Sequence, residues 1–560
     1  MRLIGKSEGP TRQGPTRQGP TRRGVLLAGA AVAGCATASG GSPWQEYDIA
    51  PSGLAFGHLR WAEGPEGQRR ADLGDGRYLN PIFAGDYPDP AVLRDADAYY
   101  ATFSSFDAYP GLTLWRSEDL VNWTPFGAAL RQPIGSVWAP DLCKHNGRYY
   151  LYIPARTRTY RSIYVIHAER MEGPWSDPID LGLPAHIDPC HVADHDGRRF
   201  LFLSGGDRVR LSEDGLSLAG AVEHVYDPWR YPDDWTVESF SPEGPKIAWR
   251  APYWYMITAV GGTAGPPTGH MVIAARARSL DGPWEDCPHN PLIRTRSARE
   301  KWWSRGHATL LEGPQGDWHL MYHGYENGFW TLGRQTLLEP VSWGEDGWFS
   351  AEGGDLSRPL RKPLPGPPQP HGAPLSDDFS TDRLGTQWRF YDPGPEEHLR
   401  LRRGAFGLGM SAKGTTPSDC SPLSFICGDL GYEVETEIEI DPETEAGLIL
   451  FYNRRLYAGL GFRSSGLVMH RYGLQRRSAA PEGLAQRLFL RLQNDRNIVT
   501  IHHSLDGLTW RRFGVQMEVS GYHHNTMGDF LSLRPSLYAA GQGEARFRRV
   551  SYRALPQGPA

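Results

Sequence analysis

Asn146-Gly147-Arg148-Tyr149-Tyr150-Leu151-Tyr152-Ile153 begins with a polar turn and continues as an aromatic and apolar run typical of a β-strand. A turn followed by such a run returns at residues 95–103, 196–203, 251–257 and 316–322. The corresponding positions Tyr100, Tyr150, Phe200, Tyr255 and His319 are 50, 50, 55 and 64 residues apart. Because a propeller blade contains four strands, this spacing predicts one blade per repeat and a five-bladed β-propeller over residues 80–355.

The composition supports an all-β protein. The 560 residues include 66 Gly, 46 Pro, 19 Trp and 25 Tyr, which indicates many turns and much aromatic surface. The chain is too long for one ordinary core and suits two domains. An irregular β-sandwich with chance periodicity is the competing interpretation of the repeats.

A second β-domain is predicted after a proline-rich segment. Residues 356–376 contain seven prolines and resemble a semi-rigid linker. Beyond them, residues 431–441 alternate glutamates with apolar or β-branched residues, which predicts a strand with one wet and one buried face. Similar runs follow at 487–492 and 498–501. We therefore expect a β-sandwich over residues 377–555.

Charge and cysteine spacing exclude several function classes. The formal net charge is −5, and the first 35 residues carry six basic side chains and one acid, so the remainder is near −10. A mildly acidic body without a basic stripe argues against nucleic acid as a partner and favours a neutral substrate such as a sugar. The six cysteines lack zinc-ligand spacing. Only Cys420 and Cys427 are close enough in sequence for a local disulfide, and free thiols are the alternative.

The amino terminus resembles a targeting signal. Arg22-Arg23 precede a short apolar stretch, as in a twin-arginine export signal, and Val32-Ala33-Gly34-Cys35 resembles a lipobox whose cysteine is lipidated. Simple cleavage after Ala36-Thr37-Ala38 is the alternative. We assign residues 1–38 to the signal and 39–79 to an N-terminal extension. The mature protein is expected to be exported, periplasmic or anchored to the outer membrane, with membrane contact only through a lipid anchor.

Three acids lie beside prolines near the starts of the first, third and fourth predicted blades. They are Asp89 in Tyr87-Pro88-Asp89-Pro90, Asp188 in Asp188-Pro189, and Glu243 in Glu243-Gly244-Pro245. Each of these patterns alone is a common turn. A propeller gathers its inner strands around one axis, however, so acids at equivalent positions in different blades are expected to converge.

In this order the motifs resemble glycoside hydrolase family 43, and the similarity extends through Val137-Trp138-Ala139-Pro140-Asp141, Gly306-His307-Ala308 and Gly333-Arg334-Gln335-Thr336. The trailing domain is similar to the concanavalin-like sandwich often appended to that family. The resemblance implies that Asp89 is the general base, Glu243 the general acid, and Asp188 the residue that tunes and orients the acid. The chemistry agrees, because inversion requires one carboxylate to activate water and one protonated carboxyl to assist departure. A third carboxylate nearby would raise the pKa of Glu243.

The resemblance also implies roles for three further residues. Arg334 would face the sugar and the acids, with a surface ion pair as the alternative. Trp138 would form an apolar wall for the sugar, with core packing as the alternative. His307 could lie on the axis, where relatives often hold calcium or a water cluster, although a lone histidine is more often only hydrogen-bonded. No cofactor is required on this view, and a structural calcium is compatible with it.

We therefore expect an inverting β-D-xylosidase or α-L-arabinofuranosidase that releases xylose or arabinose from plant hemicellulose. An endo-arabinanase of the same family and a non-catalytic carbohydrate-binding surface lipoprotein are the alternatives. Three departures from the family pattern leave the choice of substrate open. They are Ile187 before Asp188, Cys190 after it, and Lys246 where the xylosidase branch usually has histidine.

Overall fold

The computed structural model describes residues 60–404 and 407–557, and its regular structure is almost entirely β. In this part of the chain the one α-helix is α1 (His524–Met527), and the short 3-10 turns are η1 (Pro65–Gly67), η2 (Ser204–Gly206), η3 (Trp330–Leu332) and η4 (Glu397–Arg400). None of the helices described is long and apolar enough to cross a membrane. The expected export signal and lipobox lie outside the described residues.

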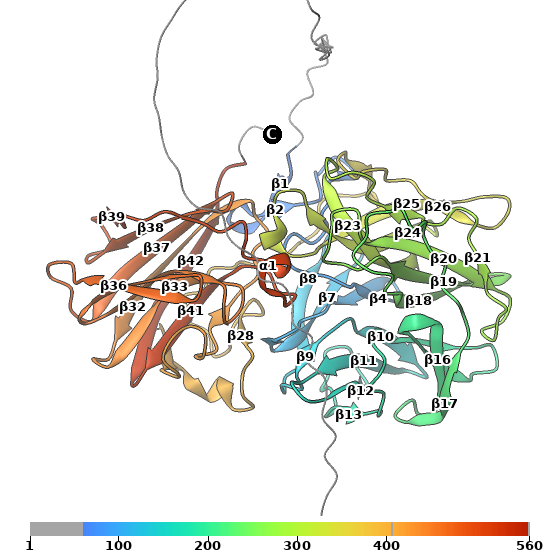
Figure 1. Cartoon of the computed structure of the whole chain (residues 1–560), viewed down its shortest axis with the longest axis horizontal. Helices are drawn as coiled ribbons and strands as arrows, with labels where there is room; N and C mark the ends of the chain where they lie inside the picture. The colour runs from blue at the N-terminus through green and yellow to red at the C-terminus, as the bar shows by residue number, and fades with distance from the viewer. Residues whose placement is uncertain (1–59, 405–406, 558–560) are drawn as a thin grey trace, which may run out of the picture. The chain divides into compact units, whose positions relative to one another are not determined.

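Five antiparallel sheets follow one another along the chain as the blades of a β-propeller (Figure 1). The first blade contains β4 (Ala91–Asp95), β5 (Ala98–Thr102), β7 (Gly111–Ser117) and β8 (Thr124–Leu130), and the second contains β9 (Ser136–Val137), β10 (Asp141–His145), β11 (Arg148–Arg156), β12 (Arg161–Ala168) and β13 (Ile179–Asp180). The third contains β14 (Cys190–Ala193), β15 (Arg199–Leu203), β16 (Asp207–Leu211) and β17 (Leu218–His224). The fourth contains β18 (Glu243–Arg250), β19 (Tyr253–Val260), β20 (Met271–Ala277), β21 (Glu285–Asp286) and β22 (Ile293–Arg294). The fifth contains β23 (Trp302–Glu312), β24 (Trp318–Glu326), β25 (Gln335–Trp343) and β26 (Phe349–Ala351).

The predicted aromatic runs are the second strands of the five blades, namely β5, β11, β15, β19 and β24. The turn that opens β11 shows why the sequence folds in this way. Asn146 and Gly147 have φ of 49° and 79°, and His145 pairs with Arg148 across them. Two residues with positive φ form the tight hairpin that matches the twist of the flanking strands. The prediction of a five-bladed propeller is confirmed.

The proline-rich segment packs along the propeller. Its strand β27 (Leu360–Arg361) pairs with β3 (Arg77–Tyr78), which follows β1 (Ala62–Glu63) and β2 (Arg69–Arg70). The next residue, Lys362, is buried, and its Nζ lies 2.7 Å from Asp72 Oδ2 and 3.2 Å from Asp119 Oδ2. This segment is therefore held against the first blade by a strand pair and a buried cation.

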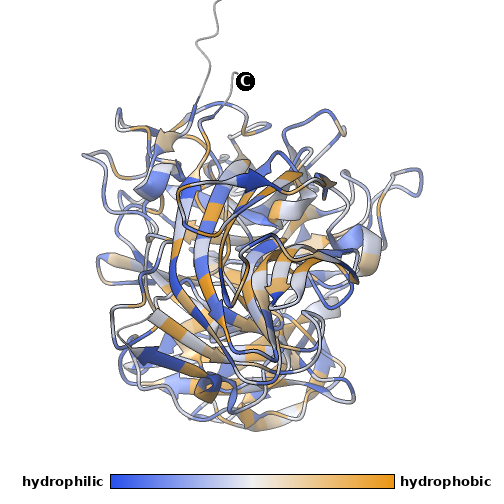
Figure 2. Ribbon diagram, turned by 90° about the vertical axis from the view of Figure 1, so that its left-hand side faces the viewer, coloured by the Kyte–Doolittle hydropathy of each residue, from blue (hydrophilic) through white to orange (hydrophobic). Residues whose placement is uncertain are grey.

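Two large antiparallel sheets form the C-terminal concanavalin-like sandwich. One runs in the order β36 (Leu474–Ala479), β35 (Gly466–Arg471), β34 (Tyr457–Arg463), β33 (Thr444–Phe451), β41 (Arg534–Gly541), β31 (Leu423–Ser424), β28 (Arg389–Tyr391) and β6 (Ala108–Tyr109). The other runs β29 (Leu401–Gly404), β30 (Gly407–Ser411), β42 (Glu544–Ala554), β32 (Gly431–Ile440), β37 (Arg487–Asp495), β38 (Ile498–Ser504) and β39 (Arg511–Arg512), and β40 (Met517–Glu518) also pairs with β38. Buried residues alternate with half-exposed ones along β32, as predicted, and Figure 2 shows similar alternation of hydropathy along strands of this domain.

The propeller and the sandwich share a strand pair and a buried ion pair. β6 lies in the sequence between β5 and β7 of the first blade. Its residue Tyr109 nevertheless pairs with Phe390 of β28, so β6 is an edge strand of the sandwich sheet. Arg534 of β41 lies 2.9 Å from Asp86, and both side chains are buried. Because a buried ion pair broken on one side leaves an uncompensated charge, these contacts fix the sandwich against the start of the first blade.

The suggested disulfide between Cys420 and Cys427 is wrong. Both residues are buried free cysteines, and burial raises the pKa of each thiol to about 12. They behave as small apolar side chains inside the sandwich core.

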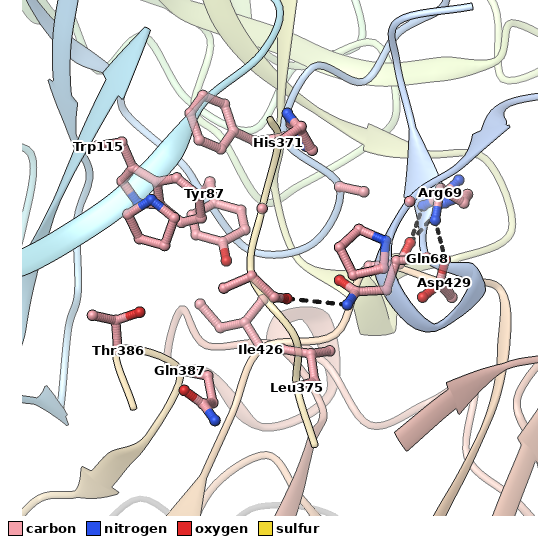
Figure 3. Close-up of a pocket in the computed structure, with 18 of the residues that line it drawn as sticks. Gln68, Arg69, Tyr87, Trp115, His371, Leu375, Thr386, Gln387, Ile426 and Asp429 are labelled. Carbon is pink, nitrogen blue, oxygen red and sulfur yellow. Dashed lines mark hydrogen bonds between the residues drawn. The ribbon is translucent and has the colours of Figure 1, made fainter. Parts of the chain in front are cut away.

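A cavity of about 70 Å³ lies where the N-terminal extension and the first blade meet the sandwich. Figure 3 shows Tyr87, Trp115 and Leu375 on its wall and the hydrogen bond from Gln68 Nε2 to Ala373 O, which is 3.1 Å long. None of the three predicted acids lines this cavity. We therefore regard it as a packing void at the domain boundary rather than as the reaction site.

Candidate active site

Asp89 is fixed by contacts from the first and the fifth blade. It precedes β4 between two prolines, its φ is 58°, and it is 5% exposed. Its Oδ1 lies 2.9 Å from Arg334 Nη1 and 3.1 Å from His323 Nδ1, while Ser104 Oγ donates to Oδ2 at 2.5 Å. A non-glycine residue with positive φ persists only where its surroundings hold it, so the fold itself aims this carboxylate.

The charge around Asp89 keeps it ionised. Burial on its own would raise the pKa of Asp89, but the Arg334 cation, together with His307 and His323, holds that pKa well below its usual value. Burial lowers the pKa of both histidines to about 3, so the permanent positive charge at this carboxylate belongs to Arg334. Asp89 can therefore accept a proton from water across the physiological pH range.

Asp188 and Glu243 lie together on neighbouring blades. Their carboxyl oxygens and a ring nitrogen of His307 all lie within 4.8 Å of one another. Asp188 has φ of 54°, is 5% exposed, and its Oδ2 accepts a hydrogen bond of 3.0 Å from the N–H of Gly244. The side chain of Glu243 is 20% exposed, so it faces the solvent-accessible side of the cluster.

The surroundings of these two acids favour their protonated forms. Burial raises the pKa of Glu243 to about 7, and the negative charge of Asp89 acts in the same direction. Burial, then the charges of Glu243 and Asp89, raise the pKa of Asp188 well above its usual value. A carboxyl group that keeps its proton at this pH can act as a general acid.

His307 is adjacent to all three acids and is held by close packing. Its Nδ1 lies 3.4 Å from Asp89 Oδ1, and its φ is 59°. A Cβ on Gly244 would come within 2.8 Å of the His307 ring, and a Cβ on Gly306 within 2.5 Å of the His270 ring. His270 Nε2 in turn lies 3.4 Å from Glu243 Oε1. The two glycines therefore make room for two imidazoles beside the acid.

The donors around His307 do not by themselves complete a calcium site. His307, Asp188 and Glu243 offer one nitrogen and two carboxyl groups, whereas calcium takes six to eight ligands, so water would have to supply the remainder. We therefore derive no catalytic step through a metal.

A loop of the sandwich reaches the edge of the site. The Phe530 ring stacks on that of Phe106 in the first blade region, with ring centroids 5.5 Å apart. The His524 ring also stacks on Phe530, with centroids 4.3 Å apart. The Arg334 guanidinium lies 5.4 Å from the Phe106 centroid and 5.2 Å from that of Phe530. The C-terminal domain therefore contacts Arg334, the cation that pairs with Asp89.

The structure brings Asp89, Asp188, Glu243, His307 and Arg334 together and leaves Trp138 at the edge. Trp138 is half-buried beside Val137, which pairs with Phe106, and it packs against the core cluster of the sandwich. Sequence reasoning did not find several residues of the site, which are Ser104, Thr263, His270, His323 and Phe530. His323 lies inside β24, where nothing in an aromatic strand pattern distinguishes a site residue from a core residue.

Two domain models match this chain in succession. That of glycosyl hydrolases family 43 matches residues 78–349, and that of the β-xylosidase C-terminal concanavalin A-like domain matches 376–553. The chain belongs to glycosyl hydrolase family 43. This family 43 protein is therefore a glycosidase, and its paired carboxyls are the groups that such an enzyme needs.

Relatives and solved structures cover both domains. The family 43 chain is 28% identical to a xylan 1,3-β-xylosidase of a Vibrio species over 495 residues, covering 78% of this chain and 90% of that protein. It is 31% identical over 342 residues to a non-reducing end α-L-arabinofuranosidase of Bacteroides ovatus, covering 56% of this chain and 61% of that protein. A xylan β-1,4-xylosidase from Bacillus halodurans superposes with a TM-score of 0.75 at 26% identity, covering 85% of this chain and 99% of that one.

Proposed function

We propose that this enzyme is an exo-acting pentosidase that releases xylose or arabinose from hemicellulose fragments with inversion at the anomeric carbon. The observation that carries the proposal is the convergence of three acids on His307, which lies 3.4 Å from Asp89 and within 4.8 Å of Asp188 and Glu243. The charge of Arg334 lowers the pKa of Asp89 well below its usual value, while burial raises the pKa of Glu243 in the same site to about 7. The xylosidases and the arabinofuranosidase among the relatives support the choice of pentose.

In the proposed reaction Asp89 removes a proton from water as the water oxygen bonds to the anomeric carbon. The bond from that carbon to the glycosidic oxygen breaks, and Glu243 gives its proton to the departing oxygen. Arg334 holds Asp89 at 2.9 Å and is proposed to contact the sugar as well. Asp188 orients Glu243 through the hydrogen bond from Gly244, and Trp138 is proposed as part of the apolar wall.

The sandwich loop supports exo rather than endo action. Phe530 and His524 pack beside Phe106 and Arg334, next to Asp89, whereas an endo-arabinanase would need an open groove there for the continuing chain. A purely sugar-binding lipoprotein has no need of a buried carboxyl that stays protonated. Neither alternative therefore explains the described site as well as an exo-glycosidase does.

Hydrolysis of 4-nitrophenyl β-D-xyloside and 4-nitrophenyl α-L-arabinofuranoside tests the proposal directly. We expect turnover of at least one of them, with a loss of about 10²- to 10⁴-fold in Asp89→Asn. Undiminished turnover by Asp89→Asn would remove the assignment of the base. Absence of turnover by the native enzyme on every pentoside, together with retained binding of xylo-oligosaccharides, would favour the binding protein.

We also propose that the enzyme is exported and anchored through Cys35, on the motifs Arg22-Arg23 and Val32-Ala33-Gly34-Cys35. Labelling of cells with a radioactive fatty acid should mark the native protein and leave Cys35→Ala unmarked. Equal labelling of both proteins would contradict the anchor. Retention of the native protein in the cytoplasm would contradict export.

A further inference from the structure

Glu238 lies in the segment that leads into β18, and it is exposed to solvent. Its Oε2 accepts hydrogen bonds of 2.9 Å from the N–H of Ala264 and 3.0 Å from the N–H of Gly265. Its own N–H donates to Gly261 O at 3.0 Å. Glu238 therefore holds both ends of the turn at residues 261–265, which begins the connection from β19 to β20.

The turn is shaped around the side chain of Glu238. Gly262 has a φ of 75°, and a Cβ on it would lie 2.5 Å from Glu238 Oε2. A Cβ on Gly265 would lie 2.6 Å from the Cβ of Glu238. Because glycine lacks a Cβ, these two positions let the carboxylate reach the backbone N–H groups of the turn. The carboxylate and the two glycines therefore form one fitted unit.

The middle residue of this turn, Thr263, connects it to the proposed base. Thr263 Oγ1 lies 3.0 Å from His323 Nε2 and 3.4 Å from Arg334 Nη1. His323 Nδ1 and Arg334 Nη1 lie 3.1 Å and 2.9 Å from Asp89 Oδ1. These four contacts close a ring that includes the carboxylate. Because a hydroxyl group both donates and accepts, Thr263 can pair with His323 Nε2 in either tautomer of the ring.

The direction of the Asp89 carboxylate depends on this ring. His323 and Arg334 both contact Oδ1, and they share Thr263 as a hydrogen-bond partner. If the turn relaxes, Thr263 moves, and both groups lose a contact that fixes them. A shift of about 1 Å in a reacting group can lower the rate about 100-fold.

We propose that Glu238 is a positioning residue that orients Asp89 through the hydroxyl group of Thr263. The contacts of Glu238 are with the turn, so its effect on the base passes through that hydroxyl. The inference rests on the proposed function, because the direction of the Asp89 carboxylate matters only if Asp89 activates the water.

The test separates the reach of the Glu238 side chain from its charge. Glu238→Gln removes the charge but keeps an oxygen that can accept from both N–H groups. Glu238→Asp keeps the charge but is one methylene shorter, so its oxygen no longer reaches them. Glu238→Ala, Thr263→Val and the double variant Glu238→Ala/Thr263→Val complete the set. Glu172→Ala, which removes an exposed glutamate of the second blade, is the control.

Each protein is assayed on 2,4-dinitrophenyl β-D-xyloside and on xylobiose, or on the corresponding arabinosides if those are preferred. We expect Glu238→Ala, Glu238→Asp and Thr263→Val to lose about 10- to 100-fold in kcat, with less change in KM. The losses should be similar on both substrates, because water must be activated whatever group departs. Glu238→Gln should keep at least about one third of the native kcat, because its hydrogen bonds remain.

The double variant tests whether Glu238 acts through Thr263. If it does, kcat of Glu238→Ala/Thr263→Val should lie within about 3-fold of the poorer single variant, since residues that act through one contact are not additive. Losses that multiply in the double variant would overturn the inference in favour of two independent roles. Thermal melting curves check that the variants are folded. If Glu238→Ala does not fold, the comparison of Glu238→Asp with Glu238→Gln still decides the role of the side chain.

Native-like kcat in Glu238→Asp, or a loss in Glu238→Gln as large as in Glu238→Asp, would overturn the inference. A loss confined to xylobiose would also overturn it, because Glu238 would then act on the acid and not on the base. Asp89→Asn is the reference for the base. Undiminished turnover in Asp89→Asn would mean that the proposed function fails. A large loss there, with native-like kcat in the Glu238 variants, would remove the present inference alone.

Discussion

The Arg334 guanidinium lies 2.9 Å from Asp89 Oδ1, and both side chains are almost completely buried. The N–H of Arg334 also donates to Asp86 at 3.3 Å, and Asp86 in turn pairs with Arg534 of the sandwich at 2.9 Å. The cation that keeps Asp89 ionised is therefore positioned partly by the C-terminal domain. This arrangement explains why the two domains are packed so closely around the reaction site.

Removal of the Arg334 charge should lower kcat/KM at acidic pH. Burial raises the pKa of Asp89, and Arg334 is the largest of the effects that lower it, so Arg334→Met should raise that pKa. The base must be ionised to act, so the acidic limb of kcat/KM against pH should move to higher pH. Arg116→Met removes an exposed arginine and is the control. An unmoved acidic limb in Arg334→Met would contradict the role given to this pair.

The native enzyme should lose activity as the pH rises through about 7. Burial and the charge of Asp89 raise the pKa of Glu243 to about 7, and the acid works only while it holds its proton. The plateau of kcat/KM should therefore lie at acidic pH and fall tenfold per pH unit on the alkaline side. Measurement of kcat/KM from pH 4 to 10 checks this expectation. A profile that is flat up to pH 9 would contradict it.

Gly244→Ala should abolish most activity without unfolding the protein. The new Cβ would lie 2.8 Å from the His307 ring at a residue whose φ is 61°, so the ring and the strand beside Glu243 must both shift. Small misplacements of reacting groups cost about 100-fold in rate. Gly127→Ala is the matched control, because a Cβ there meets nothing within 4 Å. Similar kcat/KM in the two variants would show that the close packing at His307 is not required.

Phe530→Ala should weaken substrate binding and remove the aromatic contact beside Arg334. Phe530 stacks on Phe106 and lies against Arg334, so its loss removes an aromatic pair worth about 0.5–1.5 kcal/mol. We expect KM for a xyloside to rise about 2- to 10-fold, with longer products appearing from xylan digests. Leu508→Ala, on an 85% exposed side chain of the same domain, is the control. An unchanged KM and product pattern in Phe530→Ala would refute the part given to the sandwich loop.

The fold could be predicted because the turn residues, the strand pattern and the spacing of the repeats all indicate a β-propeller. Asn146-Gly147 predicts a tight turn, and the aromatic run after it forms the second strand of a blade. Because this pattern occurs five times, it predicts five blades. The acids could be found because their neighbours are prolines and glycine, which mark special backbone. Asp89 and Asp188 indeed have positive φ, and Gly244 has the close contact that only glycine permits.

The residues that sequence reasoning missed lack such local signals. His323 and His270 resemble ordinary core positions, and only the closure of the propeller brings them to Asp89 and Glu243. The spacing of Cys420 and Cys427 suggested a bond that the fold does not make. Lys246 was visible as a departure from the family pattern, but its partner Asp141 is 105 residues away and could be identified only in three dimensions.

The configuration of the sugar released first tests the central claim most directly. If Asp89 activates water while Glu243 protonates the departing oxygen, the anomeric configuration must invert in a single displacement. Proton NMR of a β-xyloside during the first minutes of hydrolysis should therefore show α-xylose before mutarotation, or the inverted anomer of whichever pentoside is cleaved. First release of the anomer with the configuration of the substrate would contradict the account, because a carboxylate would then have bonded to the sugar.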